Sequence, residues 1–246
     1  MPFTRLLRDG VVAGAAAGLG AALVLWLLVE PVIRRALVIE EARGGADHAA
    51  GEEPPVSRAL QVIGGLATAA IVGVLVGVVF AVVFARTRHR LPGSTDLGRA
   101  AALALVGFTV VTLLPGLKLP ANPPAVGDPA TVTERTLLYL LTILVGLLVV
   151  GLVLAADAWL THRGVAATSR TVAKTVLAVG GAVAVLALVP GSPDSVPKDV
   201  PATLLWDFRV ASLAQLAAMW LVLGLVFGAL AEARTRAQRV AAPASV

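Results

Sequence analysis

The chain has 246 residues, of which 58% are hydrophobic and only 14% are charged. Its mean hydropathy is +0.89, and its apolar content exceeds the roughly 45–50% of soluble domains, which indicates a membrane protein. There is no cysteine, so disulfides and thiolate metal sites are excluded. The formal net charge of +5 reflects topology in such a protein, and no nucleic-acid partner is predicted.

Six apolar runs without charges follow one another along the chain. A bilayer core needs roughly 17–25 residues at helical rise, and five of the runs reach that length. The fifth has 15 charge-free residues before Pro190, although Lys174 could snorkel and extend it. We expect six transmembrane helices, with five as the alternative, over about residues 10–30, 59–85, 99–116, 136–156, 172–189 and 208–231.

These helices are predicted to form one all-α, polytopic integral membrane bundle over residues 1–231, because the loops are too short for a folded soluble domain. The N-terminus, residues 86–99, residues 157–174 and the C-terminal tail share one side. They hold 12 of the 20 basic residues but four of the 15 acids. Basic residues favour the cytoplasmic side, so both termini are predicted to be cytoplasmic. Residues 232–246 are predicted to form a basic, disordered cytoplasmic tail.

A proline lies near the C-terminal end of the first, the third and the fifth run. Pro31, Pro115 and Pro190 are each predicted to end a helix, because proline cannot donate the helical hydrogen bond.

The segment after the first run is rich in carboxylates and holds one histidine. Carboxylate oxygens and imidazole suit hard or borderline divalent cations such as manganese, zinc, nickel or cobalt. The sequence therefore offers a loose metal contact on the outer face; the alternative is an acidic loop that is merely solvated. No stably bound cofactor is predicted, only transient contact with cobalt or another divalent metal. The candidate residues are Glu40, Glu41, Asp47, His48, Glu52 and Glu53.

Glycines recur at helical spacing in three of the runs. Such spacing lets two helix backbones approach closely, either within one chain or between subunits, so a homo-oligomer is left open. The candidate packing residues are Gly14, Gly18, Gly73, Gly77, Gly224 and Gly228.

The interiors of the six runs carry no Asp, Glu, Lys, Arg or His, only mildly polar side chains such as Thr112, Thr142 and Ser212. Because proton relays in membranes use buried ionisable groups, a proton-coupled pump with a midplane carboxylate is not predicted. No glycine-rich phosphate loop or catalytic pair is found, so we predict that the protein is not an enzyme.

Three segments resemble one known family. They are RLLRDGVVAGAAAGL with VEPVI at residues 5–19 and 29–33, LLPGLKLPANPP at residues 113–124, and the last span from residue 200 to Gly228, which contains FRVASL. Together they resemble the predicted cobalt transporter subunit family, CbtA. The residues that carry the resemblance are Pro115, Gly116, Pro120, Pro201, Phe208, Arg209, Ser212, Leu213 and Trp220.

The resemblance implies a multi-pass protein of the bacterial cytoplasmic (inner) membrane that acts in cobalt uptake. It also implies a small partner with one transmembrane helix and a histidine-rich motif, CbtB, which could supply metal ligands that this chain lacks. The function expected is therefore an integral membrane subunit of a divalent metal uptake transporter. The alternative is a non-transporting membrane scaffold that recruits a partner through its glycine-patterned helices.

Overall fold

The structure is a computed structural model that describes residues 3–44, 57–124 and 126–241. All regular elements within these residues are helical, and six helices among them are long and apolar enough to cross a membrane. This confirms the predicted all-α fold with six spans. The fifth apolar run lies in α7, Ala167–Leu188, whose 22 residues meet the length that the sequence alone left in doubt.

The chain divides into two compact units. Unit 1 comprises residues 1–108, 123–125 and 201–246, and unit 2 comprises residues 109–122 and 126–200. The domain boundary that we predicted at residue 231 is not tested by this division.

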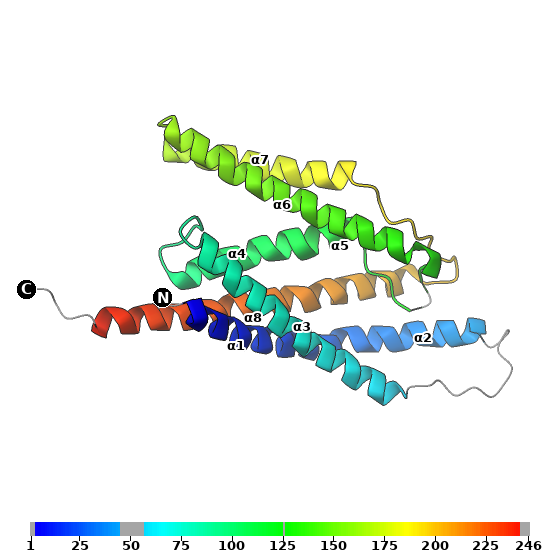
Figure 1. Ribbon diagram of the computed structural model, residues 1–246. Coiled ribbons are helices and arrows are strands. Elements are labelled where there is room, and N and C mark those ends of the chain that lie inside the picture. Colours follow the sequence, from blue (N-terminus) through cyan, green and yellow to red (C-terminus); the bar gives the residue numbers. More distant parts are fainter. Residues whose placement is uncertain (1–2, 45–56, 125, 242–246) are drawn as a thin grey trace, which may run out of the picture. The chain divides into compact units, whose positions relative to one another are not determined.

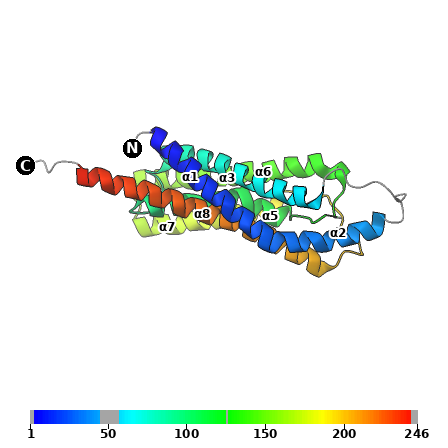
Figure 2. The ribbon, with the colours of Figure 1, turned by 90° about the horizontal axis from the view of Figure 1, so that it is seen from below.

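Unit 1 is a bundle built around the first and last helices of the chain. In Figures 1 and 2, α1 crosses α3, and α8 runs beside α1. A π-helical segment, η1, joins α1 to α2, so that these three form one continuous helix. The elements of unit 1 are α1 (Phe3–Val24), η1 (Leu25–Val29), α2 (Glu30–Gly44), α3 (Arg58–Thr87), α4 (Asp96–Gly107) and α8 (Ala202–Ala241).

Aromatic side chains fill the core of unit 1 between α3 and α8. The ring of Phe227 meets those of Phe80 and Phe84 edge to face, with centroids 5.2 and 5.0 Å apart. Phe84, Leu223 and Phe227 are fully buried. Such edge-to-face pairs add about 0.5–1.5 kcal/mol each to the burial of apolar area, so this cluster anchors α8 in the bundle.

Unit 2 consists mainly of the α6–α7 hairpin. Leu114 packs against Val185 and Val189 of the fifth span, with Val145 and Val149 of α6 beside them. Most other apolar side chains of the hairpin are exposed, as on helices that face lipid. The elements are η2 (a π-helix, Phe108–Leu113, whose first residue lies at the edge of unit 1), α5 (Leu114–Lys118), η3 (a 3₁₀ turn, Pro129–Thr131), α6 (Val132–His162) and α7.

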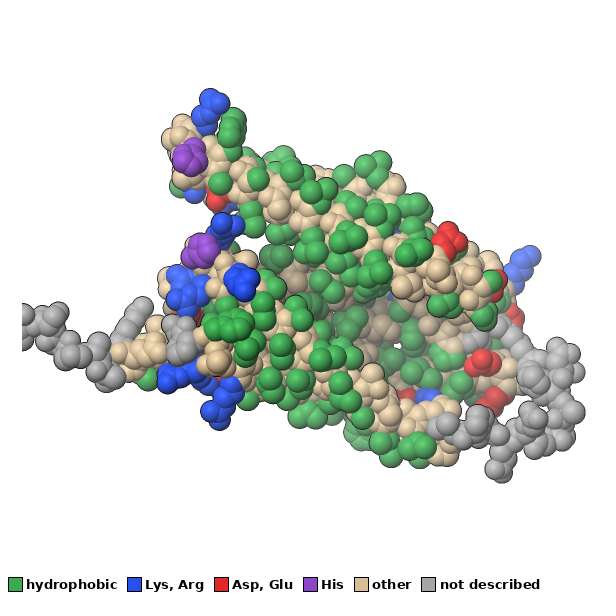
Figure 3. Space-filling model, in the orientation of Figure 1, with side chains coloured by type: hydrophobic (Ala, Val, Ile, Leu, Met, Phe, Trp, Pro, Cys, Tyr) green, Lys and Arg blue, Asp and Glu red, His purple; other side chains and the backbone are tan. Residues whose placement is uncertain are grey.

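Charged side chains gather at the helix ends within each unit. In unit 1, Figure 3 shows Lys and Arg side chains where α1 begins and α8 ends, and Asp and Glu side chains toward α2. In unit 2, a His side chain and basic side chains lie near the α6–α7 turn. Hydrophobic side chains cover the stretches between these ends.

Two of the predicted helix ends are wrong. The helix continues through Pro31 into α2 and through Pro115 to Lys118. A π-helix just before each proline, at Leu25–Val29 and at Phe108–Leu113, accommodates the proline within the helix. A π-turn changes the hydrogen-bond register, so the missing proline N–H does not stop the helix. At Pro190 the prediction is right, because α7 ends at Leu188.

The last helix is also longer than expected. α8 continues to Ala241, where the sequence predicted disorder from residue 232. Side chains of its final turns make tertiary contacts: Glu232 and Thr235 hydrogen-bond to Asp96, and Arg234 pairs with Asp9. These contacts stabilise helical turns that, from their composition alone, were predicted to be a solvated tail. Residues 242–246 lie outside the described residues.

Candidate functional site

A buried carboxylate lies in the middle of the first helix of unit 1. The side chain of Glu30 is only 3% exposed. Its Oε2 accepts a hydrogen bond of 2.6 Å from Nη2 of Arg58, and its Oε1 accepts one of 3.1 Å from Nε of Arg34. Burying an unpaired carboxylate costs several kcal/mol, so the two guanidinium groups explain how Glu30 stays charged there.

The backbone at Glu30 is unusual because it follows a π-helix and precedes a proline. The N–H of Glu30 donates to the carbonyl of Leu25, five residues back. Pro31 has no N–H and cannot donate to the carbonyl of Leu27, its usual helical partner. Helix breaks of this kind in membrane proteins often lie at ion or substrate sites.

A second ion pair ties the same helix to α8. Nη2 of Arg35 lies 2.9 Å from Oδ2 of Asp207, and both side chains are about half exposed. α2 is thus linked to α3 through a buried carboxylate and to α8 through an exposed one.

Two further buried acids hold the opposite end of unit 1 together. Asp9 of α1 is 1% exposed and forms an ion pair with Arg234 of α8. The Asp96 carboxylate accepts a 2.7 Å hydrogen bond from the hydroxyl of Thr235, and its backbone N–H donates to Glu232 at 2.7 Å. Because Glu232, Arg234 and Thr235 all belong to α8, these contacts fix this part of α8 against α1 and α4.

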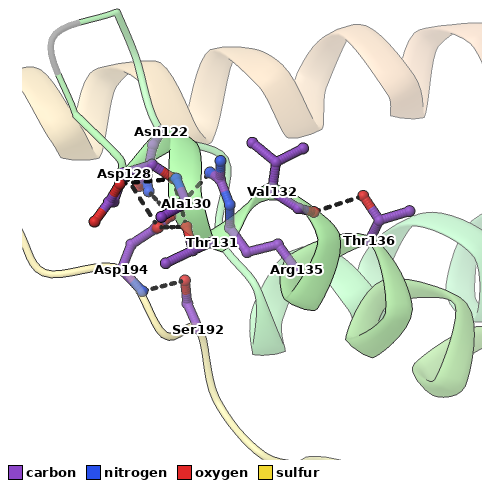
Figure 4. A network of polar contacts seen from close by, with 9 residues as sticks. All are labelled: Asn122, Asp128, Ala130, Thr131, Val132, Arg135, Thr136, Ser192 and Asp194. Carbon is purple, nitrogen blue, oxygen red and sulfur yellow. Dashed lines mark hydrogen bonds and ion pairs between the residues drawn. The ribbon is translucent and has the colours of Figure 1, made fainter.

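In unit 2, a carboxylate network joins the two loops that flank the α6–α7 hairpin (Figure 4). Oδ1 of Asp194 accepts a 2.6 Å hydrogen bond from the hydroxyl of Thr131, and Oδ2 accepts from Arg135 and Asn122, each at 2.9 Å. The N–H of Asp128 also approaches Oδ1 at 3.5 Å. Four donors nearly fill the acceptor capacity of one carboxylate, so Asp194 positions loops rather than offering ligands to a cation.

The same donors alter the acidity of Asp194. The hydrogen bond from Thr131 is the strongest influence and lowers the pKa of the carboxyl below its ordinary value, and the Asp128 N–H, the Arg135 charge and the Asn122 amide act in the same direction. Burial opposes the shift without reversing it. Asp194 is therefore ionised at neutral pH.

In unit 2, a tyrosine hydroxyl hydrogen-bonds to the backbone carbonyl that a proline leaves without its helical donor. Pro115 cannot donate to the carbonyl of Val111, four residues earlier. The hydroxyl of Tyr139 on α6 donates to that carbonyl at 2.9 Å. A carbonyl left unsatisfied in a bilayer would be costly, and the contact also binds the third span to the fourth.

A family model for the probable cobalt transporter subunit, CbtA, matches residues 3–232, nearly the whole chain. The chain belongs to the CbtA family. No curated protein and no solved structure matches it. Family membership and the six apolar helices together make this a multi-pass membrane protein and a member of a family of transporter subunits.

The metal contact expected in this CbtA-family chain falls mostly outside the described residues. Asp47, His48, Glu52 and Glu53 lie there. Glu40 and Glu41 are exposed on the last turns of α2, and not in a loop as predicted. Over the part of the chain that the structure describes, no three His, Cys, Asp or Glu side chains cluster as a metal site would require. The outer-face contact therefore remains a prediction.

The residues that carry the family resemblance mark helix breaks and helix packing. Pro115, which is fully buried, follows η2 at the break that Tyr139 repairs, and Gly116 and Pro120 follow it. Trp220 is 8% exposed, and its ring packs against Gly107 of α4. Along α8, most of the remaining motif residues are half-buried; they are Phe208, Arg209, Ser212 and Leu213, and Pro201 directly precedes the helix.

The glycines that we predicted for packing lie at two helix contacts inside unit 1. A Cβ added to Gly73 would lie 2.5 Å from the carbonyl oxygen of Gly14, and one added to Gly18 would lie 2.7 Å from backbone atoms of α3. Gly77 approaches α1 in the same way. On α8, Gly224 and Gly228 face Ala104 and Leu97 of α4.

Sequence reasoning missed Glu30 and Asp194 as site residues. Glu30 was placed at the end of the first span, because Pro31 was expected to stop the helix. Its spacing of four residues from Arg34 was an available signal for an ion pair on one helix face. The partners of Asp194 lie 59 to 72 residues earlier in the chain, and no local pattern connects them.

Proposed function

We propose that this CbtA-family protein is the membrane-spanning subunit of an uptake transporter for a divalent metal ion, with cobalt as the cargo. The observation that carries the proposal is the family match over residues 3–232, which includes all six apolar helices except the end of α8. Cobalt is a transient cargo and not a resident cofactor. The chain itself contributes a path for the ion and no catalysis.

The proposed location is the bacterial cytoplasmic membrane, with both termini in the cytoplasm. The distribution of charge supports this orientation. Arginines cluster at the start of α1 and the end of α8, whereas α2 ends in Glu40 and Glu41. Basic residues are retained on the cytoplasmic side during insertion, which places the acidic segment outside, where a cation would arrive.

A transporter subunit requires a partner. We propose a small single-span protein with a histidine-rich motif, of the CbtB type, and leave open that copies of this chain also associate. Imidazole is a good ligand for borderline divalent transition metals, and this chain has only three histidines. The partner would then supply most of the imidazole ligands. This chain would supply His48 and the carboxylates of the outer segment, which are Glu40, Glu41, Asp47, Glu52 and Glu53.

Cobalt accumulation in cells tests the proposal. The gene is deleted in cells that lack other cobalt importers, and the intact chain is then re-expressed with its partner. Accumulation of radioactive cobalt should fall on deletion and recover on re-expression. An excess of unlabelled cobalt should reduce accumulation of the label. Unchanged accumulation after deletion would refute a role in uptake.

A further inference from the structure

Glu30 is set apart from the other buried, paired acids of unit 1 by its position directly after a π-helix, and it shares with them an arginine partner that is more exposed than the acid. Its carboxylate is 3% exposed, whereas the side chains of Arg34 and Arg58 are 67% and 38% exposed. Either guanidinium group can therefore leave toward solvent or lipid headgroups, but the carboxylate cannot follow. A carboxylate that loses these partners must acquire another cation.

The chemistry next to Glu30 suits a metal cation. Pro31 withholds the hydrogen bond that the Leu27 carbonyl would otherwise accept, one turn before the carboxylate. Carboxylate and carbonyl oxygens together suit divalent cations, and broken membrane helices bind ions with such backbone oxygens. The π-helix of residues 25–29 places this change of register directly before Glu30.

We infer that Glu30 binds the transported divalent cation, which displaces the guanidinium groups of Arg58 and Arg34 as it passes. This inference rests on the proposed function and names a residue of its path. The cation and the arginines compete for the same two oxygens, so occupancy by one excludes the other. A single carboxylate with backbone oxygens binds weakly, as a site that must release its cargo should.

The competing explanation is that Glu30 and Arg58 only hold α2 to α3. A charge exchange separates the two. In the double variant E30R/R58E an ion pair can re-form with reversed polarity, which preserves a structural link. A cation site is not preserved, because the position in the helix break then carries an arginine.

The measurements are initial cobalt uptake in cells and the shift in thermal unfolding temperature that Co²⁺ produces in the purified transporter. The variants are E30Q, E30R/R58E and R58Q, with D207N as the control because Asp207 forms the exposed ion pair with Arg35 of the same helix. We expect E30Q and E30R/R58E to lose both uptake and the Co²⁺-dependent shift, while D207N keeps both. R58Q should reach half of its Co²⁺-dependent shift at a lower Co²⁺ concentration than the wild type, because a competitor has been removed.

Three results would overturn the inference. They are wild-type uptake by E30Q, restoration of uptake by E30R/R58E, and an R58Q variant whose Co²⁺ response is unchanged or weaker. If E30Q fails to accumulate in the membrane, the R58Q titration decides alone. Absence of cobalt uptake by the wild-type chain would instead refute the proposed function, so the two failures are distinguishable.

Discussion

At the scale of single residues, the acids on the basic side of the predicted topology are explained by their partners. Asp9 pairs with Arg234 and Asp157 with Arg170 and Lys174. Asp96 and Glu232 likewise form ion pairs within their own helices. The rule that basic residues favour the cytoplasmic side does not explain why these four acids lie there. In the structure, each of them forms an ion pair with an arginine near a helix end.

Replacing Asp194 with asparagine should destabilise unit 2. The change keeps the shape of the side chain but removes the charge that accepts from Thr131 and Arg135. Hydrogen bonds to a charged group contribute about 1.5–3 kcal/mol, and we expect a loss of that size in thermal unfolding in detergent micelles. Glu134→Gln is the matched control, since Glu134 is exposed nearby on α6 and should tolerate the change. Equal stability of D194N and E134Q would contradict the role given to the network.

The same network should make stability depend on pH in the acid range. The pKa of Asp194 is lower in the folded protein than its ordinary value of 3.8, so the folded state favours the ionised form. Its contribution is therefore complete above that ordinary value and is lost as pH falls through the lower folded value. The stability difference between wild type and D194N should shrink on acidification. A difference that stays constant or grows would show that the charge of Asp194 is not what stabilises the loops.

At the scale of helices, both π-segments precede a proline, but their surroundings differ. The break before Pro115 is closed by the Tyr139 hydroxyl, and the break before Pro31 lies beside a buried carboxylate. The break before Pro115 is therefore a packing contact between helices, whereas the break before Pro31 is the one that we propose as a cation-binding site.

Tyr139→Phe should destabilise the protein by about 1–3 kcal/mol, because the Val111 carbonyl loses its donor. The cost should become smaller in a Pro115→Ala background, where the restored N–H can donate to that carbonyl. A double-mutant cycle measured by thermal unfolding reports this coupling. Equal costs in both backgrounds would show that the hydroxyl does not compensate for the proline.

The same substitution at two glycines of α3 should have different effects on stability. Gly73→Ala places a methyl group 2.5 Å from the Gly14 carbonyl oxygen, and such overpacking costs about 1–3 kcal/mol. Gly64→Ala meets no atom within 4 Å and should be neutral or stabilising, because alanine favours helix by about 1 kcal/mol. Thermal unfolding of the two variants compares them directly. A destabilised G64A, or a G73A as stable as wild type, would contradict the close approach of α1 and α3.

The number of helices could be predicted from the sequence because span length and hydropathy are local properties. Where helices end could not, since Pro31 and Pro115 were taken as terminators and the π-turn that absorbs each proline leaves no local mark. The final turns of α8 were read as disordered because their support from Asp9 and Asp96 comes from distant parts of the chain. The predicted metal residues remain a prediction, as most of them lie outside the described residues.

At the scale of the whole molecule, we propose that this CbtA-family bundle conducts cobalt inward. The most direct measurement is the initial rate at which radioactive cobalt enters energised right-side-out membrane vesicles, prepared from cells that express the chain with its partner or lack both. We predict faster, saturable entry when the chain is present. Equal rates in the two preparations, with the chain verified in the membrane, would contradict the claim.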